Sequence, residues 1–398
     1  MVDCFWTALL RTEEDCDPPE PPPEPVPGSG DFIQRAELVG PGGIDEFGRF
    51  VAIDAGTAII SFLHAGSGLY RAVVYEGVAN VWTVGDTLSE TQDLKVQQVA
   101  GDLAVFTTDD GVDTGGVYVY TKSGGSWAKL QQLNTPNPNS DNIEVMDAAI
   151  SDDGEWLAVG VRNATLVATS PGYVDMYKWG GSNFVYSSRI ESPNAPGPNE
   201  YFGWAVSLSS TGVLFVGAYA NGDEGSNRGA GYTYTVSGTA WSLDETFYRS
   251  VSASSSRFGY SGMITANGEG LVVGDRVGGA EYYYHDGGGF VSDGVFDNGS
   301  GGVGARIAED VGTGAQFDAP FGSDAEVYIY EYDDGYALTQ TLTHDFTIIG
   351  GGNFIVVSDL DLRAGQLIFS MTEAESGDGL LDGQGYVYIY SRDPFIDD

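Results

Sequence analysis

A tyrosine-rich stretch recurs along the chain, and this repetition constrains the fold more than any other feature. The segments "GGVYVYTKSGGSWAKLQQL" from Gly115, "AGYTYTVSGTAWSLDETF" from Ala230 and "AEVYIYEYDDGYALTQTL" from Ala325 share one pattern. Each contains a strand that closes with tyrosine, a short turn, and a second strand that starts with an aromatic residue and ends with Leu or Phe. A strand pair repeated in this way predicts an architecture built from copies of one small sheet.

The closing tyrosines define the period of the repeat. They lie 45 to 60 residues apart, close to the length of one four-stranded propeller blade, at Tyr75, Tyr120, Tyr177, Tyr234, Tyr284, Tyr330 and Tyr390. Strands such as Val327–Tyr330 are apolar or aromatic on both faces, as expected for a blade packed between two neighbours. The chain has 58 glycines and no helical apolar period beyond Arg11, so it is predicted to be an all-β, seven-bladed propeller with four-stranded blades.

The last copy lacks its final strand, because only "SRDPFIDD" follows Tyr390. The segment "GDFIQRAELVG" supplies the missing pattern near the N-terminus, where Phe32 and Leu38 have the spacing found in the complete copies. The N-terminal strand is therefore predicted to pair beside the strand that contains Tyr388 and Tyr390. This pairing would close the ring and remove the open edges of the sheets.

The propeller is assigned to residues 31–398, and two short segments precede it. Residues 17–30, "DPPEPPPEPVPGSG", are predicted to be a linker, because consecutive prolines favour extended polyproline II. Residues 1–16 are richer in apolar side chains than a disordered tail usually is, and they are predicted to dock into another subunit, with a disordered tail as the alternative. The four residues expected to make this contact are Phe5, Trp6, Leu9 and Leu10.

The charge of the chain restricts its partners. There are 57 acidic and 17 basic residues, which gives a formal net charge of −40. Such a surface repels nucleic acid and anionic membranes, so neither is expected as a partner. The acid-rich, lysine-poor mixture favours a marine or halophilic source, where salt screens the self-repulsion. The N-terminus lacks the basic start of a signal peptide, and the sequence leaves open whether Cys4 and Cys16 are bonded.

The best-defined copy, "YFGWAVSLSSTGVLFVGAYANGDEGSNRGAGYTYTVSGTAWSL", resembles an FG-GAP repeat, the blade of integrin-α-type propellers and of many microbial surface proteins. The resemblance implies a seven-bladed propeller and adhesion or ligand binding rather than catalysis. The residues that carry it are Phe47-Gly48, Phe202-Gly203 and Phe258-Gly259 at the blade starts and Val216-Gly217-Ala218-Tyr219 at the GAP-like turn.

The calcium loop of that family is missing from this chain. Calcium-binding members carry an Asp-rich loop before the GAP strand, and here that place is taken by "LSSTG", "TANGEG", "VAGD" and "SDDGE". The family's calcium sites are therefore not transferred, and no cofactor is required. Other acidic loops stay open as Ca²⁺ candidates or as chance clusters in an acidic chain, namely Asp109, Asp110 and Asp113, Asp359 and Asp361, and Asp378 and Asp382.

Catalytic signatures are absent from the sequence, and an enzyme is not predicted. There is no G-x-S-x-G elbow and no cysteine nucleophile in the propeller. Binding is expected through the loops of one face or through the central channel. The long insertions that mark candidate loops fall at 134–142, 162–172, 192–200 and 373–384. Trp204, Tyr219 and Tyr260 are candidates for stacking on sugars, with packing between blades as the alternative. Asn163 and Asn298 begin glycosylation sequons.

These features favour a non-enzymatic display and attachment module on a virion surface or in another extracellular setting. The hypothesis is a capsid decoration, turret or tail-fibre protein of a phage or archaeal virus from a saline habitat, held by residues 1–16 to other structural proteins of the assembly, in which it is homo-oligomeric. Its expected ligand is a host-surface glycan or protein. A cell-surface adhesin of a marine or halophilic microbe is the alternative, and a glycan-active enzyme is the second alternative.

Overall fold

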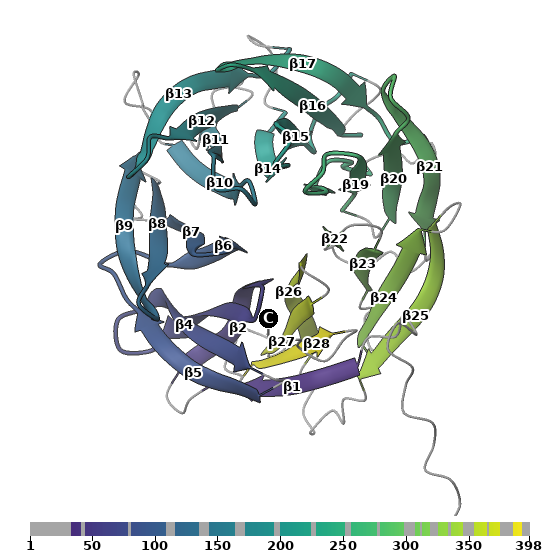
Figure 1. Ribbon diagram of the computed structural model, residues 1–398. Helices are drawn as coiled ribbons and strands as arrows, with labels where there is room; N and C mark the ends of the chain where they lie inside the picture. The colour runs from purple at the N-terminus through teal and green to yellow at the C-terminus, as the bar shows by residue number, and fades with distance from the viewer. Residues whose placement is uncertain are drawn as a thin grey trace, which may run out of the picture.

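The computed structural model is an all-β propeller whose sheets surround a central axis (Figure 1). The described strands form seven four-stranded antiparallel sheets, here called blades 1 to 7. No helix among the described residues is long and apolar enough to span a membrane. The structure describes residues 33–40, 44–78, 81–108, 116–134, 143–163, 172–194, 200–223, 228–250, 256–276, 279–297, 307–310, 313–318, 325–332, 336–344, 354–363, 366–374 and 385–391.

Blades 1 to 6 each use four strands in chain order, from the innermost strand to the outermost. Blades 1 to 3 comprise β2 (Ile44–Asp54), β3 (Thr57–His64), β4 (Leu69–Val78) and β5 (Val81–Leu88); β6 (Lys95–Ala100), β7 (Leu103–Thr108), β8 (Gly116–Ser123) and β9 (Ser126–Asn134); and β10 (Ile143–Ile150), β11 (Trp156–Asn163), β12 (Tyr173–Trp179) and β13 (Phe184–Glu191). Blades 4 to 6 comprise β14 (Phe202–Leu208), β15 (Val213–Ala218), β16 (Ala230–Ser237) and β17 (Ala240–Phe247); β18 (Ser261–Ile264), β19 (Gly270–Gly274), β20 (Gly279–His285) and β21 (Phe290–Asp297); and β22 (Ile307–Asp310), β23 (Thr313–Asp318), β24 (Ala325–Tyr332) and β25 (Tyr336–His344).

Blade 7 is built from both ends of the described chain. It contains β26 (Phe354–Arg363), β27 (Gln366–Ala374) and β28 (Tyr386–Ser391), and β1 (Ile33–Val39) pairs antiparallel with β28 as the outermost strand. Ile33 lies opposite Ser391, and Leu38 lies opposite Val387. In Figure 1 the purple strand β1 runs alongside the yellow strand β28. The predicted closure of the ring by the N-terminal strand is therefore confirmed.

The described side chains named for this closure lie in the interior of the structure. Leu38, Tyr388 and Tyr390 are all buried, while Phe32 lies just outside the described residues. The Tyr390 hydroxyl donates to the side-chain oxygen of Gln34, across the pair of strands. Tyr388 and Tyr390 of β28 are thus buried beside the outer strand, as the closing tyrosines of blades 1 to 5 are beside theirs.

Each outermost strand pairs with its neighbour through a β-bulge at the closing tyrosine. The register shifts immediately before Tyr75, Tyr120, Tyr177, Tyr234, Tyr283, Tyr330 and Tyr390. In blade 5 the equivalent residue is therefore Tyr283, and the sequence-based choice of Tyr284 was wrong by one position. Because bulges bend and twist a strand, this repeated irregularity makes the outer edges poor templates for pairing with another chain.

The hydrophobic core is a series of layers between neighbouring blades rather than one central mass. Ile53 and Ile60 of blade 1 pack in one cluster with Ile368 and Ile389 of blade 7. Comparable clusters join blades 1 and 2, 2 and 3, 3 and 4, and 4 and 5. Burial on both faces of the sheets that these clusters join explains their continuous apolar strands.

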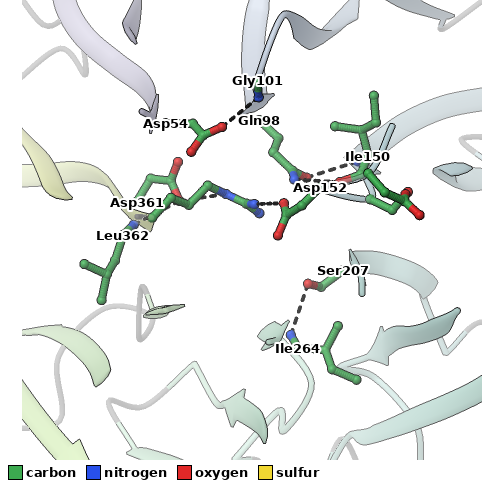
Figure 2. Close-up of polar contacts among 12 residues, drawn as sticks. Asp54, Gln98, Gly101, Ile150, Asp152, Ser207, Ile264, Asp361 and Leu362 are labelled. Atoms are coloured by element: carbon green, nitrogen blue, oxygen red, sulfur yellow. Dashed lines mark hydrogen bonds and ion pairs between the residues drawn. The ribbon is translucent and has the colours of Figure 1, made fainter. Parts of the chain in front are cut away.

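Near the axis, polar side chains connect several neighbouring blades (Figure 2). The Ser207 hydroxyl of blade 4 accepts a 3.1 Å hydrogen bond from the backbone N–H of Ile264 in blade 5. Gln98 of blade 2 both donates to the carbonyl and accepts from the N–H of Ile150 in blade 3. Asp361 of blade 7 accepts from the N–H of Ile53 in blade 1, at 2.9 Å. These contacts satisfy backbone groups that inner strands would otherwise bury without partners.

Candidate functional site

The glycines of the Phe-Gly motif allow two consecutive blades to touch through their backbones. Gly203 and Gly259 have φ values of +86° and +80°, a region that side chains rarely adopt. An ideal Cβ on Gly160 of blade 3 would lie 2.1 Å from the carbonyl oxygen of Gly203, and one on Gly217 of blade 4 would lie 2.2 Å from that of Gly259. The start of each of these blades is therefore held against the end of the second strand of the preceding blade.

This contact brings three repeated positions together on one face of blades 3 to 5. The first position precedes the phenylalanine of the Phe-Gly motif, and the second follows the glycine of that motif. The third lies near the end of the second strand of a blade, two residues after a different glycine. Their seven side chains, called the aromatic–arginine cluster below, are Tyr201 and Arg257, Trp204 and Tyr260, and Arg162, Tyr219 and Arg276.

The aromatic rings of the cluster contact one another across the seam between blades 4 and 5. Tyr201 and Tyr219 are stacked, with centroids 4.9 Å apart and an interplanar angle of 14°. The ring of Trp204 meets the ring of Tyr219 edge-on, with centroids 4.7 Å apart. It meets the ring of Tyr260 at a tilt, with centroids 5.5 Å apart. All four rings are partly exposed. The rings thus pack between blades, which was the alternative given to sugar stacking in the sequence analysis. They also reach the surface.

Guanidinium groups lie over three of the four rings. Arg162 is 5.4 Å from the centroid of Tyr201, and Arg257 is 5.8 Å from that of Tyr219. Arg276 is 6.0 Å from the centroid of Tyr260. Cation–π contacts at these distances orient the arginines on the ring faces. Among the described residues, Trp204 is the ring of this cluster that no cation covers.

The cluster is a local concentration of positive charge in a strongly acidic chain. Arg162 is paired with Glu144. Arg257 and Arg276 form no ion pair with any carboxylate in the described part of the chain. Burial raises the pKa of the Tyr219 hydroxyl above its ordinary value, while Arg162 and Arg257 oppose that shift. The hydroxyl therefore stays protonated at neutral pH and can donate a hydrogen bond.

Two members of the cluster have an unusual backbone conformation. Tyr201 and Arg257 have φ values of 56° and 58°, and Glu46, at the same position before Phe47 in blade 1, has a φ of 48°. A non-glycine residue at positive φ is uncommon and stores strain that the surrounding structure must support. The repeat imposes the same turn in three blades, and in blades 4 and 5 that turn presents a cluster residue.

The acidic candidates in blade 7 serve as links between blades. Asp359 accepts a hydrogen bond from the N–H of Val51 at 2.9 Å, next to the equivalent bond from Ile53 to Asp361. Burial raises the pKa of Asp361 to about 6, and the nearby Arg363 partly offsets this shift. Each carboxylate thus already has a backbone partner in blade 1.

The other predicted sites lie largely outside the described residues. No group of three or more His, Cys, Asp or Glu side chains in the described ranges is placed to hold a metal ion. Asn163 is the last residue of β11, and its side chain is not described. The remaining candidates outside the description are Phe5, Trp6, Leu9, Leu10, Asp109, Asp110, Asp113, Asp378, Asp382 and Asn298, together with most of the four long insertions.

Comparison with known proteins agrees with the fold. The FG-GAP repeat model matches residues 193–234, which run from the entry of blade 4 into β16. A crystal structure of Raptor from Chaetomium thermophilum is similar with a TM-score of 0.53 and 9% identity, over 90% of this chain and 28% of the Raptor chain. At that identity the similarity shows the fold alone. No curated protein matches the chain.

The repeat match and the propeller arrangement together support an FG-GAP-like propeller. That class is compatible with a binding or adhesion module. Sequence reasoning had selected Trp204, Tyr219 and Tyr260 but had missed Tyr201 and the three arginines. The signal was present, because the seven residues occupy equivalent positions in consecutive copies, before and after the Phe-Gly pair and near the end of the second strand.

Proposed function

We propose that the chain is a non-enzymatic attachment module that binds a surface ligand through the aromatic–arginine cluster. One observation carries the proposal. In a chain of net charge −40, Arg257 and Arg276 lie on aromatic rings at a partly exposed surface and lack a described carboxylate partner. Arginines and aromatic residues are the side chains most enriched at energetically important positions in binding surfaces.

The test compares the loss of the two cluster arginines with the loss of an arginine at the Phe-Gly turn of blade 1. The labelled full chain is applied to immobilised microbial surface polysaccharides and to immobilised S-layer protein. Arg257→Gln combined with Arg276→Gln should reduce retention at least tenfold. Arg49→Gln, at the position after Phe47-Gly48 in blade 1, should leave retention unchanged. Equal retention by both variants, or no retention of the unmodified chain, would refute the proposal.

The absence of catalysis is tested on the same surfaces. Polysaccharides recovered after long incubation with the chain should keep their length and their number of reducing ends. Release of new reducing ends that persists after purification to homogeneity would support the glycan-active enzyme instead.

Within this function, we propose a structural role on a virion surface. The lysine-poor, acidic composition and the apolar residues Phe5, Trp6, Leu9 and Leu10 support it. Removal of residues 1–16 should leave a folded propeller that no longer joins its assembly. Normal incorporation of the shortened chain would contradict docking through this segment.

A further inference from the structure

The ligand chemistry of the aromatic–arginine cluster follows from Arg257 and Arg276, which form no ion pair with a carboxylate among the described residues. We propose that the cluster binds an acidic saccharide, whose carboxylate or sulfate group pairs with Arg257 and Arg276 and whose sugar ring packs against Trp204. This assignment rests on the proposed binding function and specifies the class of ligand.

The two arginines are suited to an oxyanion. A guanidinium has five N–H donors in a planar fork that matches carboxylate and sulfate oxygens. A guanidinium that lies over a ring face keeps the donors in its own plane available. Elsewhere in the described chain the buried Arg249 is paired with Asp275, and the half-buried Arg189 is paired with Asp175. Arg257 and Arg276 therefore have donor capacity that those pairs do not.

The aromatic part of the cluster favours a sugar over a simple ion. Trp204 is partly exposed and lies 5.5 Å from Tyr260, and no guanidinium from the described ranges lies over its ring. An aromatic face with polar groups at its rim suits a ring that is apolar on its C–H faces and polar at its hydroxyls. The Tyr219 hydroxyl adds a donor on the ring that Arg257 covers.

The position of the cluster is fixed before the ligand arrives. Gly229 lies so close to blade 5 that an ideal Cβ there would be 2.0 Å from the carbonyl oxygen of Phe258. Gly229 and Phe258 also form an isolated parallel bridge. Arg257 is adjacent to this contact in the chain, so its backbone cannot move without separating the blades. Preorganisation of this kind lowers the entropic cost of binding.

The charge of the chain favours an acidic saccharide over an acidic protein as the ligand of the cluster. A protein that covered the cluster would bring its surface against the coat that gives this chain a net charge of −40. A saccharide chain is narrow and can confine its charge to the cluster. At physiological ionic strength screening acts over about 8 Å, so a narrow ligand would avoid much of the repulsion from the remaining surface.

The experiment measures the affinity of the full chain for four probes of similar length by calorimetry. These are an oligogalacturonate, a sulfated galactan oligosaccharide, a neutral galactan oligosaccharide and a poly-glutamate peptide. We expect one or both acidic saccharides to bind, and their comparison identifies a carboxylate or a sulfate as the recognised group. Arg257→Gln with Arg276→Gln should weaken that binding at least tenfold, and Trp204→Leu should weaken it several-fold. Arg49→Gln should change it less than twofold.

Three results would overturn the saccharide assignment. They are poly-glutamate binding as tightly as the acidic saccharides, neutral galactan binding as tightly, or equal losses in the Arg49→Gln control and the double variant. Thermal unfolding of each variant confirms that the propeller is intact. A further result would be that no acidic saccharide binds although Arg257→Gln with Arg276→Gln abolishes retention on microbial surfaces. That result would support the attachment function and refute the assignment of an acidic saccharide as the ligand. If the double variant changes neither measurement, both proposals fall.

Discussion

Arg363 of β26 donates a hydrogen bond to the carboxylate of Asp152, in the turn between β10 and β11, and so joins blade 7 to blade 3 (Figure 2). Blades 1 and 2 lie between these two sheets in the ring, so the contact links blades that share no seam. The same guanidinium lies 3.8 Å from Asp361, measured from Nε to Oδ1. Arg363 thus contacts both a buried carboxyl of its own blade and a carboxylate of blade 3.

The ion pair between Arg363 and Asp152 should couple the two blades weakly. The Asp152 side chain is 36% exposed, so solvent screens the pair and its coupling free energy should be about 1 kcal/mol or less. A double-mutant cycle with Arg363→Ala and Asp152→Ala, measured by denaturant unfolding, gives this value. Arg363→Ala alone should cost more than Asp152→Ala, because Asp361 also loses its neighbouring cation. Equal single-variant costs would show that Asp361 does not depend on Arg363.

The stability of the propeller should depend on pH through Asp361. Burial raises the pKa of this carboxyl from 3.8 to about 6, so the folded state holds the proton more tightly than the unfolded state does. The stabilisation that protonated Asp361 gives to the folded state is therefore fully present below about pH 4. As the pH rises to about 6, the free energy of unfolding should fall by about 3 kcal/mol because this stabilisation is lost.

The measurement is the free energy of unfolding of the unmodified chain relative to Asp361→Asn between pH 4 and pH 7. As the pH rises, the unmodified chain should lose stability relative to the Asp361→Asn variant, and this relative loss should level off above pH 6. In an Arg363→Ala background the window should extend to higher pH, since that cation lowers the pKa of Asp361. A difference independent of pH would contradict the assignment.

The close approach of blades 4 and 5 should make Gly217 intolerant of a side chain. A Cβ at this position would lie 2.2 Å from the carbonyl oxygen of Gly259, which is backbone and cannot rotate away. Gly217→Ala should therefore destabilise the fold by about 2–3 kcal/mol. Gly294→Ala is the matched control, because its Cβ would meet nothing within 4 Å. Similar melting temperatures for the two variants would argue against the backbone contact.

The closure of the ring should tolerate rearrangement of the chain but not loss of β1. In a circular permutant, a short linker joins Ser391 to Ile33 and new ends are placed between Gly124 and Gly125, a turn where an added Cβ meets nothing. This permutant should fold with nearly unchanged stability. Deletion of residues 1–39 should destabilise the chain strongly and cause aggregation, because the edge of β28 is left open. A deletion variant that stays monomeric and melts like the full chain would contradict this.

Chelation should not affect the stability of the propeller. Asp359 and Asp361 already accept backbone hydrogen bonds from blade 1, so their part in the fold needs no cation. The melting temperature should be the same with EDTA and with CaCl₂ at constant ionic strength. A large decrease in EDTA would reveal a structural Ca²⁺ site and would direct attention to the acidic loops around Asp109 and Asp378.

Much of the fold could be predicted from the sequence because each blade repeats the same side-chain pattern. The strand that contains Leu38 was placed correctly beside Tyr390, since a blade that lacks its outer strand leaves an unpaired edge. The register in blade 5 was not recoverable in this way. Three consecutive tyrosines, Tyr282 to Tyr284, satisfy the pattern equally well, and the position of the bulge decides among them.

The candidate site was harder to predict, because it depends on contacts between copies rather than within one. Arg162 lies near the end of β11 in blade 3, whereas Tyr201 directly precedes β14 of blade 4, and the approach of Gly160 to Gly203 brings them together. The links made by Asp359 and Asp361 were hidden for a similar reason. Clustered acids in a chain with 57 of them carry little information until their backbone partners are known.

The pairing of β1 with β28 also determines how the molecule would respond to mechanical force. Ile33 lies opposite Ser391 in an antiparallel pair, so both ends of the described chain leave blade 7 at the same end of that pair. Tension applied between the ends would break the hydrogen bonds of this pair one after another, beginning at Ile33, instead of shearing them all at once. The ring would open first at blade 7, while each of the other sheets, a single continuous run of chain, would lengthen later.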